Sequence, residues 1–270
     1  MTAGVFEKET APRVLIAILA KQKEPFLPLY LRCLEKLDYP KSSIFLYVRT
    51  NNNTDRTEQL LRNWLSRVGS LYGGVEFDAQ NVPEPVEQFG AHEWNAMRFR
   101  VLGRLRGESL RKTVEHNCQF YFVADADNFI RPETLKELVA VNLPIVAPLL
   151  RMTLPNDPYS NFHAAVDGNG YYKEVPHYHV LLHRRIRGLI EVPLVHCTYL
   201  VRADVISRLA YQDQTERHEY IVFSDVARAQ GIPQYLDNRS VYGRILFDNT
   251  GSASLEKNIL EVKSILDSVG

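Results

Sequence analysis

Short apolar runs alternate with segments of helical periodicity through the first half of this sequence. The runs lie at residues 14–20, 44–48, 75–77 and 120–124, and the helical segments lie between them at 25–37, 57–68 and 93–117. Strands that alternate with helices favour a parallel sheet with helices on both faces. We therefore predict an α/β fold built on a single Rossmann-like, mixed but mostly parallel sheet. We expect the helix at 93–117 to break near Gly103 or Gly107.

The second half of the sequence continues this pattern with one irregular stretch. Helical periodicity predicts helices at 132–141 and 217–230 and a terminal helix at about 255–269, and apolar runs predict strands at 145–149 and 192–201. Between them, residues 151–192 are rich in Asn, Asp, Gly, Pro, Tyr and His. Such a stretch is either a disordered insert or the wall of an active site, and its Tyr and Phe residues favour an ordered wall.

The motif Asp125-Ala126-Asp127 stands directly after the apolar run at 120–124. Because side chains alternate along a strand, Asp125 and Asp127 are expected to face the same edge, with the small Ala126 between them. A hard cation allows two neighbouring carboxylates to stay charged, and their oxygens suit Mg²⁺ or Mn²⁺. The motif predicts a metal site for a diphosphate; a surface turn in which one Asp caps the helix near Pro132 is the alternative.

The overall composition excludes several partner classes. Lys plus Arg equals Asp plus Glu at 32 each, so no global field favours nucleic acid or an anionic membrane. The longest apolar runs are about seven residues, so we expect no integral membrane segment. Cys33, Cys118 and Cys197 lack metal-ligand spacing, and no signal-like apolar block opens the chain. These features predict a cytoplasmic protein.

Further candidates for a nucleotide site follow the first two predicted strands. Ala20 ends the first, and the tract from Asn51 to Asp55 follows the second, where amide side chains offer donors and acceptors to a uracil or ribose. The sequence contains neither GxGxxG nor GxxxxGK[ST], so cationic side chains such as Arg98 are expected to meet a diphosphate. As alternatives, Asn51 and Asp55 serve only a turn or a helix start, and Arg98 lies on a solvated face.

An enzyme that transfers a group from a nucleotide needs a base near the reacting carbon in addition to the nucleotide site. Glu219 is the candidate, because it stands at a predicted helix start ahead of an apolar stretch. Its alternative role is to offset the helix dipole. His196, in an apolar run, is by default a core histidine, and a metal or acceptor contact stays open for it and for His218.

Several blocks of this sequence together resemble one family, the amino-terminal glycosyltransferase domain of procollagen galactosyltransferases and their relative, cerebral endothelial cell adhesion molecule. From about residue 13 to 245 the blocks occur in the family's order: 49–55 (RTNNNTD), 123–129 (VADADNF), 145–149 (IVAPL), 159–162 (YSNF), 170–173 (GYYK), 192–198 (VPLVHCT) and 238–243 (NRSVYG). The resemblance implies a GT-A fold, a UDP-sugar donor, and Mn²⁺ or Mg²⁺ bound by Asp125 and Asp127. His218-Glu219 replaces the family's paired aspartates.

On this resemblance, residues 1–270 form a single GT-A domain, with a nucleotide-binding half at about 13–130, an acceptor-side half at about 131–250 and the C-terminal helix. The expected function is metal-dependent transfer of a hexose, galactose or glucose, from a UDP-sugar to a hydroxyl acceptor, for which we name no molecule. A catalytically silent GT-A binding or adhesion module is the alternative. A phosphatase is disfavoured, because its nucleophilic aspartate usually stands on the first strand.

Overall fold

A computed structural model describes residues 11–88, 93–153, 157–247 and 252–267. Its main sheet has eight strands in the order β3-β2-β1-β4-β11-β6-β12-β9. The strands are β1 (Val14–Ala20), β2 (Ile44–Thr50), β3 (Gly74–Asp78), β4 (Phe120–Ala124), β6 (Ile145–Pro148), β9 (Leu189–Val192), β11 (Thr198–Arg202) and β12 (Gln234–Asp237). Pairing is parallel among the first four and between β6 and β12, whereas β11 and β9 run antiparallel to their neighbours. The predicted mixed, mostly parallel sheet is confirmed.

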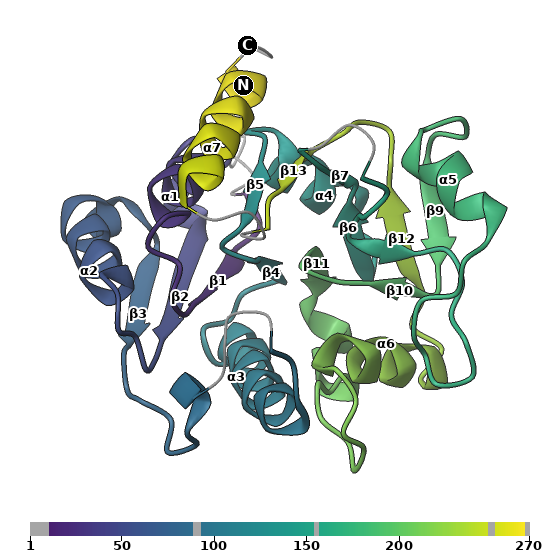
Figure 1. Cartoon of the computed structure of the whole chain (residues 1–270), viewed down its shortest axis with the longest axis horizontal. Coiled ribbons are helices and arrows are strands. Elements are labelled where there is room, and N and C mark those ends of the chain that lie inside the picture. The colour runs from purple at the N-terminus through teal and green to yellow at the C-terminus, as the bar shows by residue number, and fades with distance from the viewer. Residues whose placement is uncertain (1–10, 89–92, 154–156, 248–251, 268–270) are drawn as a thin grey trace, which may run out of the picture.

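Helices cover both faces of this sheet, as Figure 1 shows, with α1 and α7 on one side of it and α3 and α6 on the other. The helices are α1 (Leu27–Glu35), α2 (Thr57–Val68), α3 (Ala96–Glu115), α4 (Thr134–Val141), α5 (Pro176–Leu182), α6 (Glu219–Ala229) and α7 (Ser252–Asp267). Within β1, Val14, Ile16 and Ile18 join one buried cluster, and Leu15 and Ala17 join another. Strands buried on both faces explain the continuous apolar runs in the sequence.

Two small sheets lie beyond the main one. The first contains β5 (Asn128–Ile130), β13 (Gly243–Ile245) and β7 (Leu150–Met152), and the second pairs β8 (Phe162–His163) with β10 (Leu194–Val195). Short 3-10 turns lie at Lys41–Ser43, Gly69–Leu71, Val86–Gln88 and Ala203–Arg208. None of the helices in the described ranges is both long and apolar enough to cross a bilayer.

Two predicted elements are wrong. The helix α3 runs without a break through Gly103 and Gly107, and a Cβ at Gly103 would lie 2.7 Å from the backbone oxygen of Tyr211. This glycine therefore permits close packing rather than ending the helix. The single strand expected at 192–201 is instead divided among β9, β10 and β11. Pro193 lies between β9 and β10, and Cys197, whose backbone is left-handed with φ +62°, lies between β10 and β11.

The expected ordered wall at 151–192 contains β7, β8, α5 and β9, apart from residues 154–156, which lie outside the described part of the chain. The terminal helix begins earlier than expected and is described to Asp267, so the last two residues of that prediction also lie outside the described part.

Candidate functional site

The aspartate motif forms a turn at the carboxyl end of β4, between β1 and β11. The backbone N–H of Asp125 donates to the carbonyl of Cys197 at 3.0 Å, and the N–H of Asn128 donates to the carbonyl of Asp125 at 2.8 Å. The carbonyl of Asp127 accepts from the N–H of Leu246 at 3.0 Å. Because hydrogen bonds to neighbouring segments hold the backbone on both sides, the positions from which the two carboxylates project are fixed.

The middle residue of the motif faces the protein. Ala126 is 2% exposed and belongs to a buried apolar cluster. Below it, the hydroxyl of Tyr30 donates to the carbonyl of Ala124 at 2.9 Å. A larger side chain at residue 126 would have to displace this packing, which is the physical reason for a small residue between the two aspartates.

Each carboxylate of the motif has a cationic partner. Arg106, on α3, donates through Nη2 to Oδ1 of Asp125 at 2.6 Å, and the Nζ of Lys23 lies 2.6 Å from Oδ2 of Asp127. Burial raises the pKa of Asp125, and the Arg106 guanidinium partly opposes this. Sequence reasoning missed both cations, because their distance from the motif along the chain conceals the contact.

The proposed base, Glu219, is the first residue of α6 and is 4% exposed. Its Oε1 lies 3.4 Å from the Nε of Arg106, whereas its Oε2 has no hydrogen-bond partner within the described residues. Burial raises the pKa of Glu219, and Arg106 lowers it. The guanidinium thus joins Glu219 to Asp125, although these residues are far apart in the sequence.

The segments after β1 and β2 are joined by hydrogen bonds between polar side chains. Thr50 donates through Oγ1 to the carbonyl of Ala20 at 2.6 Å, and the side chain of Asn51, which is 6% exposed, donates to Asn52 at 3.0 Å. Asp55 accepts from the backbone of Thr57 at 3.0 Å, at the start of α2. The structure therefore brings Ala20 and Asn51 to one sheet edge. Asp55 makes the contacts expected of a residue that stabilises the start of a helix, which was the alternative interpretation of this residue.

The predicted diphosphate contact Arg98 lies in the first turn of α3. Its Nη1 donates to the carbonyl of Glu93 at 2.7 Å, and its guanidinium lies 4.7 Å from the centroid of the Trp94 ring. Arg106, eight residues further along the same helix, is the arginine that reaches the motif.

A group of aromatic and imidazole rings, which we call the ring wall, adjoins the motif. Neighbouring members contact one another at centroid distances of 3.8 to 5.7 Å. The members are Trp94, Phe99, Tyr159, His163, Tyr172, His196, His218 and Tyr220. Of these, Tyr159, His163 and Tyr172 lie in the stretch 151–192 that was predicted to be ordered, and the other five come from outside it. The ring wall reaches the motif through Cys197, which follows His196 and accepts the backbone hydrogen bond of Asp125.

The histidines of the ring wall are desolvated. Burial lowers the pKa of His163 and of His218 to about 4, and lowers that of His196 well below its usual value. Within the described residues, His163 Nδ1 and His196 Nε2 are buried without a hydrogen-bond partner. At neutral pH these rings are therefore neutral.

The donor set of the motif fits a metal that also binds substrate. No cluster of three or more His, Cys, Asp or Glu side chains suited to a metal occurs in the described ranges. Mg²⁺ commonly takes one or two carboxylates together with substrate phosphates rather than a complete protein cage. Arg106 contacts Oδ1 of Asp125, and Lys23 contacts Oδ2 of Asp127. The other oxygen of each carboxylate is not used in these two contacts, so the motif can offer a metal the one or two carboxylate ligands that it commonly takes.

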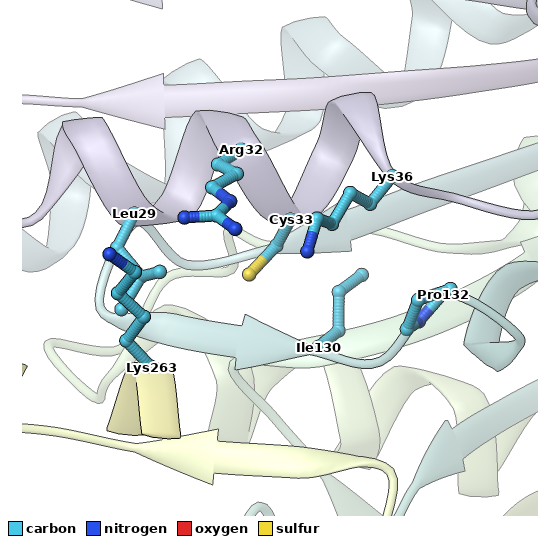
Figure 2. A pocket seen from close by; sticks show the side chains of 7 residues that line it. All are labelled: Leu29, Arg32, Cys33, Lys36, Ile130, Pro132 and Lys263. Carbon is cyan, nitrogen blue, oxygen red and sulfur yellow. The ribbon is translucent and has the colours of Figure 1, made fainter. Parts of the chain in front are cut away.

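A small cavity lies elsewhere, between α1, β5 and α7 (Figure 2). Its volume is about 40 Å³, and it is lined by Leu29, Arg32, Cys33, Lys36, Ile130, Pro132 and Lys263. None of the site residues predicted from the sequence lines this cavity. It is therefore separate from the candidate site.

Comparison with known proteins identifies relatives of the chain. The model of "Glycosyltransferase family 25, N-terminal domain" matches residues 11–266. Human procollagen galactosyltransferase 2 is 34% identical over 95% of this chain and 43% of its own length. Human inactive glycosyltransferase 25 family member 3 is also 34% identical, over 89% of this chain and 41% of its own length. The chain thus spans less than half the length of these curated relatives.

Solved structures with the same fold are more distant in sequence. TarS 1-349 from S. aureus in complex with UDP-GlcNAc is 14% identical, with a TM-score of 0.55 over 94% of this chain and 67% of that one. The mannosyltransferase PcManGT from Pyrobaculum calidifontis in complex with GDP-Man and Mn²⁺ is 15% identical, with a TM-score of 0.53 over 86% and 58%. These structures confirm the GT-A fold.

Proposed function

We propose, since the chain belongs to glycosyltransferase family 25, that it transfers a hexose from a UDP-sugar to a hydroxyl acceptor with the help of a divalent metal. The observation that carries the proposal is that Asp125 and Asp127 lie at the carboxyl edge of the sheet, where Arg106 joins Asp125 to Glu219. Ligands of open α/β sheets bind at this edge. The family match and the fold supply the reaction class.

Asp125 and Asp127 are the residues that would hold Mn²⁺ or Mg²⁺. When bound, such an ion supplies positive charge that stabilises the diphosphate as it leaves. The chain's own contribution is positional, because backbone hydrogen bonds fix the turn and Arg106 orients the carboxylate of Asp125. Ala20 and Asn51 lie at the same edge, where they would contact the uridine.

Glu219 is proposed as the base that accepts the proton of the acceptor hydroxyl. Burial raises the pKa of Glu219, and a carboxylate with a raised pKa accepts a proton more effectively than an ordinary exposed glutamate. Arg106 contacts one oxygen of this carboxylate, and the other has no partner within the described residues. The neutral ring wall beside it would receive the acceptor.

A screen of UDP-sugars for metal-dependent release of UDP tests the proposal. A positive result identifies the donor, and the Asp125→Asn/Asp127→Asn double variant is expected to lose at least about 100-fold in rate because both metal ligands are weakened. Asp38→Asn is the matched control, since Asp38 forms an exposed pair with Lys136 outside the site. Unchanged UDP release by the double variant would contradict the proposal.

A catalytically silent binding module is the second candidate, because relatives of similar identity include proteins named as inactive. This candidate predicts no turnover with any UDP-sugar. Calorimetry with UDP and Mn²⁺ separates it further. Binding heat without turnover would favour a silent module that retains the nucleotide site, whereas turnover excludes it.

A further inference from the structure

The two cations that hold the aspartate motif differ in burial. The side chain of Arg106 is 6% exposed, and it contacts both Asp125 and Glu219. The side chain of Lys23 is 30% exposed and contacts Asp127, whose own side chain is 15% exposed. A buried guanidinium with two carboxylate partners is costly to displace, whereas a partly solvated ammonium is much less so. Lys23 is thus the more exchangeable of the two.

The backbone of Lys23 is anchored, although its side chain is partly exposed. Its N–H donates to Oγ1 of Thr57 at 2.7 Å. The residue before it, Gln22, has a left-handed backbone with φ +53° and exchanges hydrogen bonds with Asn53 and Thr54. A lysine side chain carries its charge on a flexible four-carbon stem. The ammonium can therefore leave Asp127 while the segment between β1 and α1 keeps its place.

The charges of the site disfavour a divalent cation that binds without a nucleotide. Lys23 and Arg106 supply two positive charges against the carboxylates of Asp125, Asp127 and Glu219. A divalent cation at Asp127 would meet the ammonium at close range, and like charges at such a distance repel. A nucleoside diphosphate brings negative charge, which can accept the ammonium and leave the Asp127 carboxylate to the metal.

From this arrangement we propose that Lys23 is an exchangeable counter-ion of Asp127. It neutralises the carboxylate in the nucleotide-free protein and moves to the diphosphate when the nucleotide and the metal bind. The inference rests on the proposed function, because it requires a metal and a diphosphate at this motif. Metal and nucleotide then bind cooperatively: each raises the affinity for the other.

Measurement of Mn²⁺ affinity, from the electron paramagnetic resonance signal of free Mn²⁺, tests the inference without any turnover. For the unsubstituted chain we expect weak Mn²⁺ binding alone and tighter binding with UDP. Lys23→Gln is expected to bind Mn²⁺ about tenfold more tightly without UDP, because the competing charge is removed. The increase in affinity that UDP confers should be smaller in this variant. Lys23→Arg keeps the charge and should keep the weak binding.

Lys136→Gln is the matched control, because Lys136 forms a similar pair with Asp38 at 2.9 Å but both side chains are more than half exposed. Unchanged or weaker Mn²⁺ affinity in folded Lys23→Gln would overturn the inference alone, provided that Mn²⁺ and UDP still bind together. Absence of Mn²⁺–UDP binding in the unsubstituted chain and in Lys23→Gln would instead contradict the metal-dependent function.

Discussion

The proposed donor side and the proposed acceptor side of the site are stabilised by different interactions. On the donor side, polar side chains join the segments after β1 and β2, as in the 2.6 Å hydrogen bond from Gln22 to Thr54, and Lys23 pairs with Asp127. On the acceptor side, rings pack against rings, and buried His163 and His196 are neutral. Charge is concentrated where a diphosphate would bind, whereas the rings that surround Glu219 on the other side are neutral.

The contrast is what the proposed function requires of a sheet edge that would bind two ligands of unlike polarity. A diphosphate needs compensating charge, whereas a hydroxyl acceptor needs a neutral surface with hydrogen-bonding atoms. Arg106 lies at the junction, because it contacts Asp125 on the donor side and Glu219 on the acceptor side.

The largest effect is expected from Glu219→Gln, which removes the proposed base while keeping the shape of the side chain. We expect kcat to fall by about 10²–10⁴-fold, the usual contribution of a positioned base, with Mn²⁺–UDP binding retained. Steady-state UDP release and calorimetry measure the two quantities. Glu216→Gln changes an exposed glutamate of the same segment and is the matched control. Equal turnover in both variants would leave Glu219 only the role of a partner to Arg106.

A smaller effect, on stability, is expected from substitutions at the two glycines of α3, the helix that carries Arg106. A Cβ at Gly103 would lie 2.7 Å from the carbonyl of Tyr211, so Gly103→Ala should destabilise the fold by about 1–3 kcal/mol. At Gly107, in the same helix, the nearest atom would lie at 3.9 Å, and Gly107→Ala should stabilise by about 0.5–1 kcal/mol. Urea denaturation measures both. The same sign for both substitutions would show that close packing at Gly103 is not the constraint.

The smallest expected effect is the pH dependence of the acceptor side. His163 and His218 have pKa values of about 4, below the unfolded value of about 6.5. Between these values the unfolded chain binds more protons, so stability should fall as pH falls from about 6.5 to 4. His163→Gln should make this pH dependence shallower, because one of the two groups no longer titrates; urea denaturation at each pH measures it. The same substitution at exposed His177 is the control, and an equal slope in His163→Gln would count against a desolvated His163.

Much of the fold was predictable, because burial on both faces of the central strands leaves continuous apolar runs. The position of Asp125 and Asp127 at a strand end followed from the same pattern. The contacts of Arg106 and Lys23 were not predictable, because each depends on which helix or loop packs against that edge. Likewise, a glycine such as Gly103 often marks a helix break in a sequence. Its actual role, which is to allow the backbone of Tyr211 to approach α3 closely, depends on the tertiary structure.

By itself, the sequence determined the α/β pattern, the aspartate turn and the family resemblance, since these depend on local periodicity and on consecutive residues. Only the tertiary structure decided which cations neutralise Asp125 and Asp127 and that Glu219 is joined to the motif through Arg106. It also brought His163, His196 and His218 into one desolvated wall. The physical reason is that the interaction between two charges depends on their distance in space, and the number of residues between them in the sequence does not give that distance.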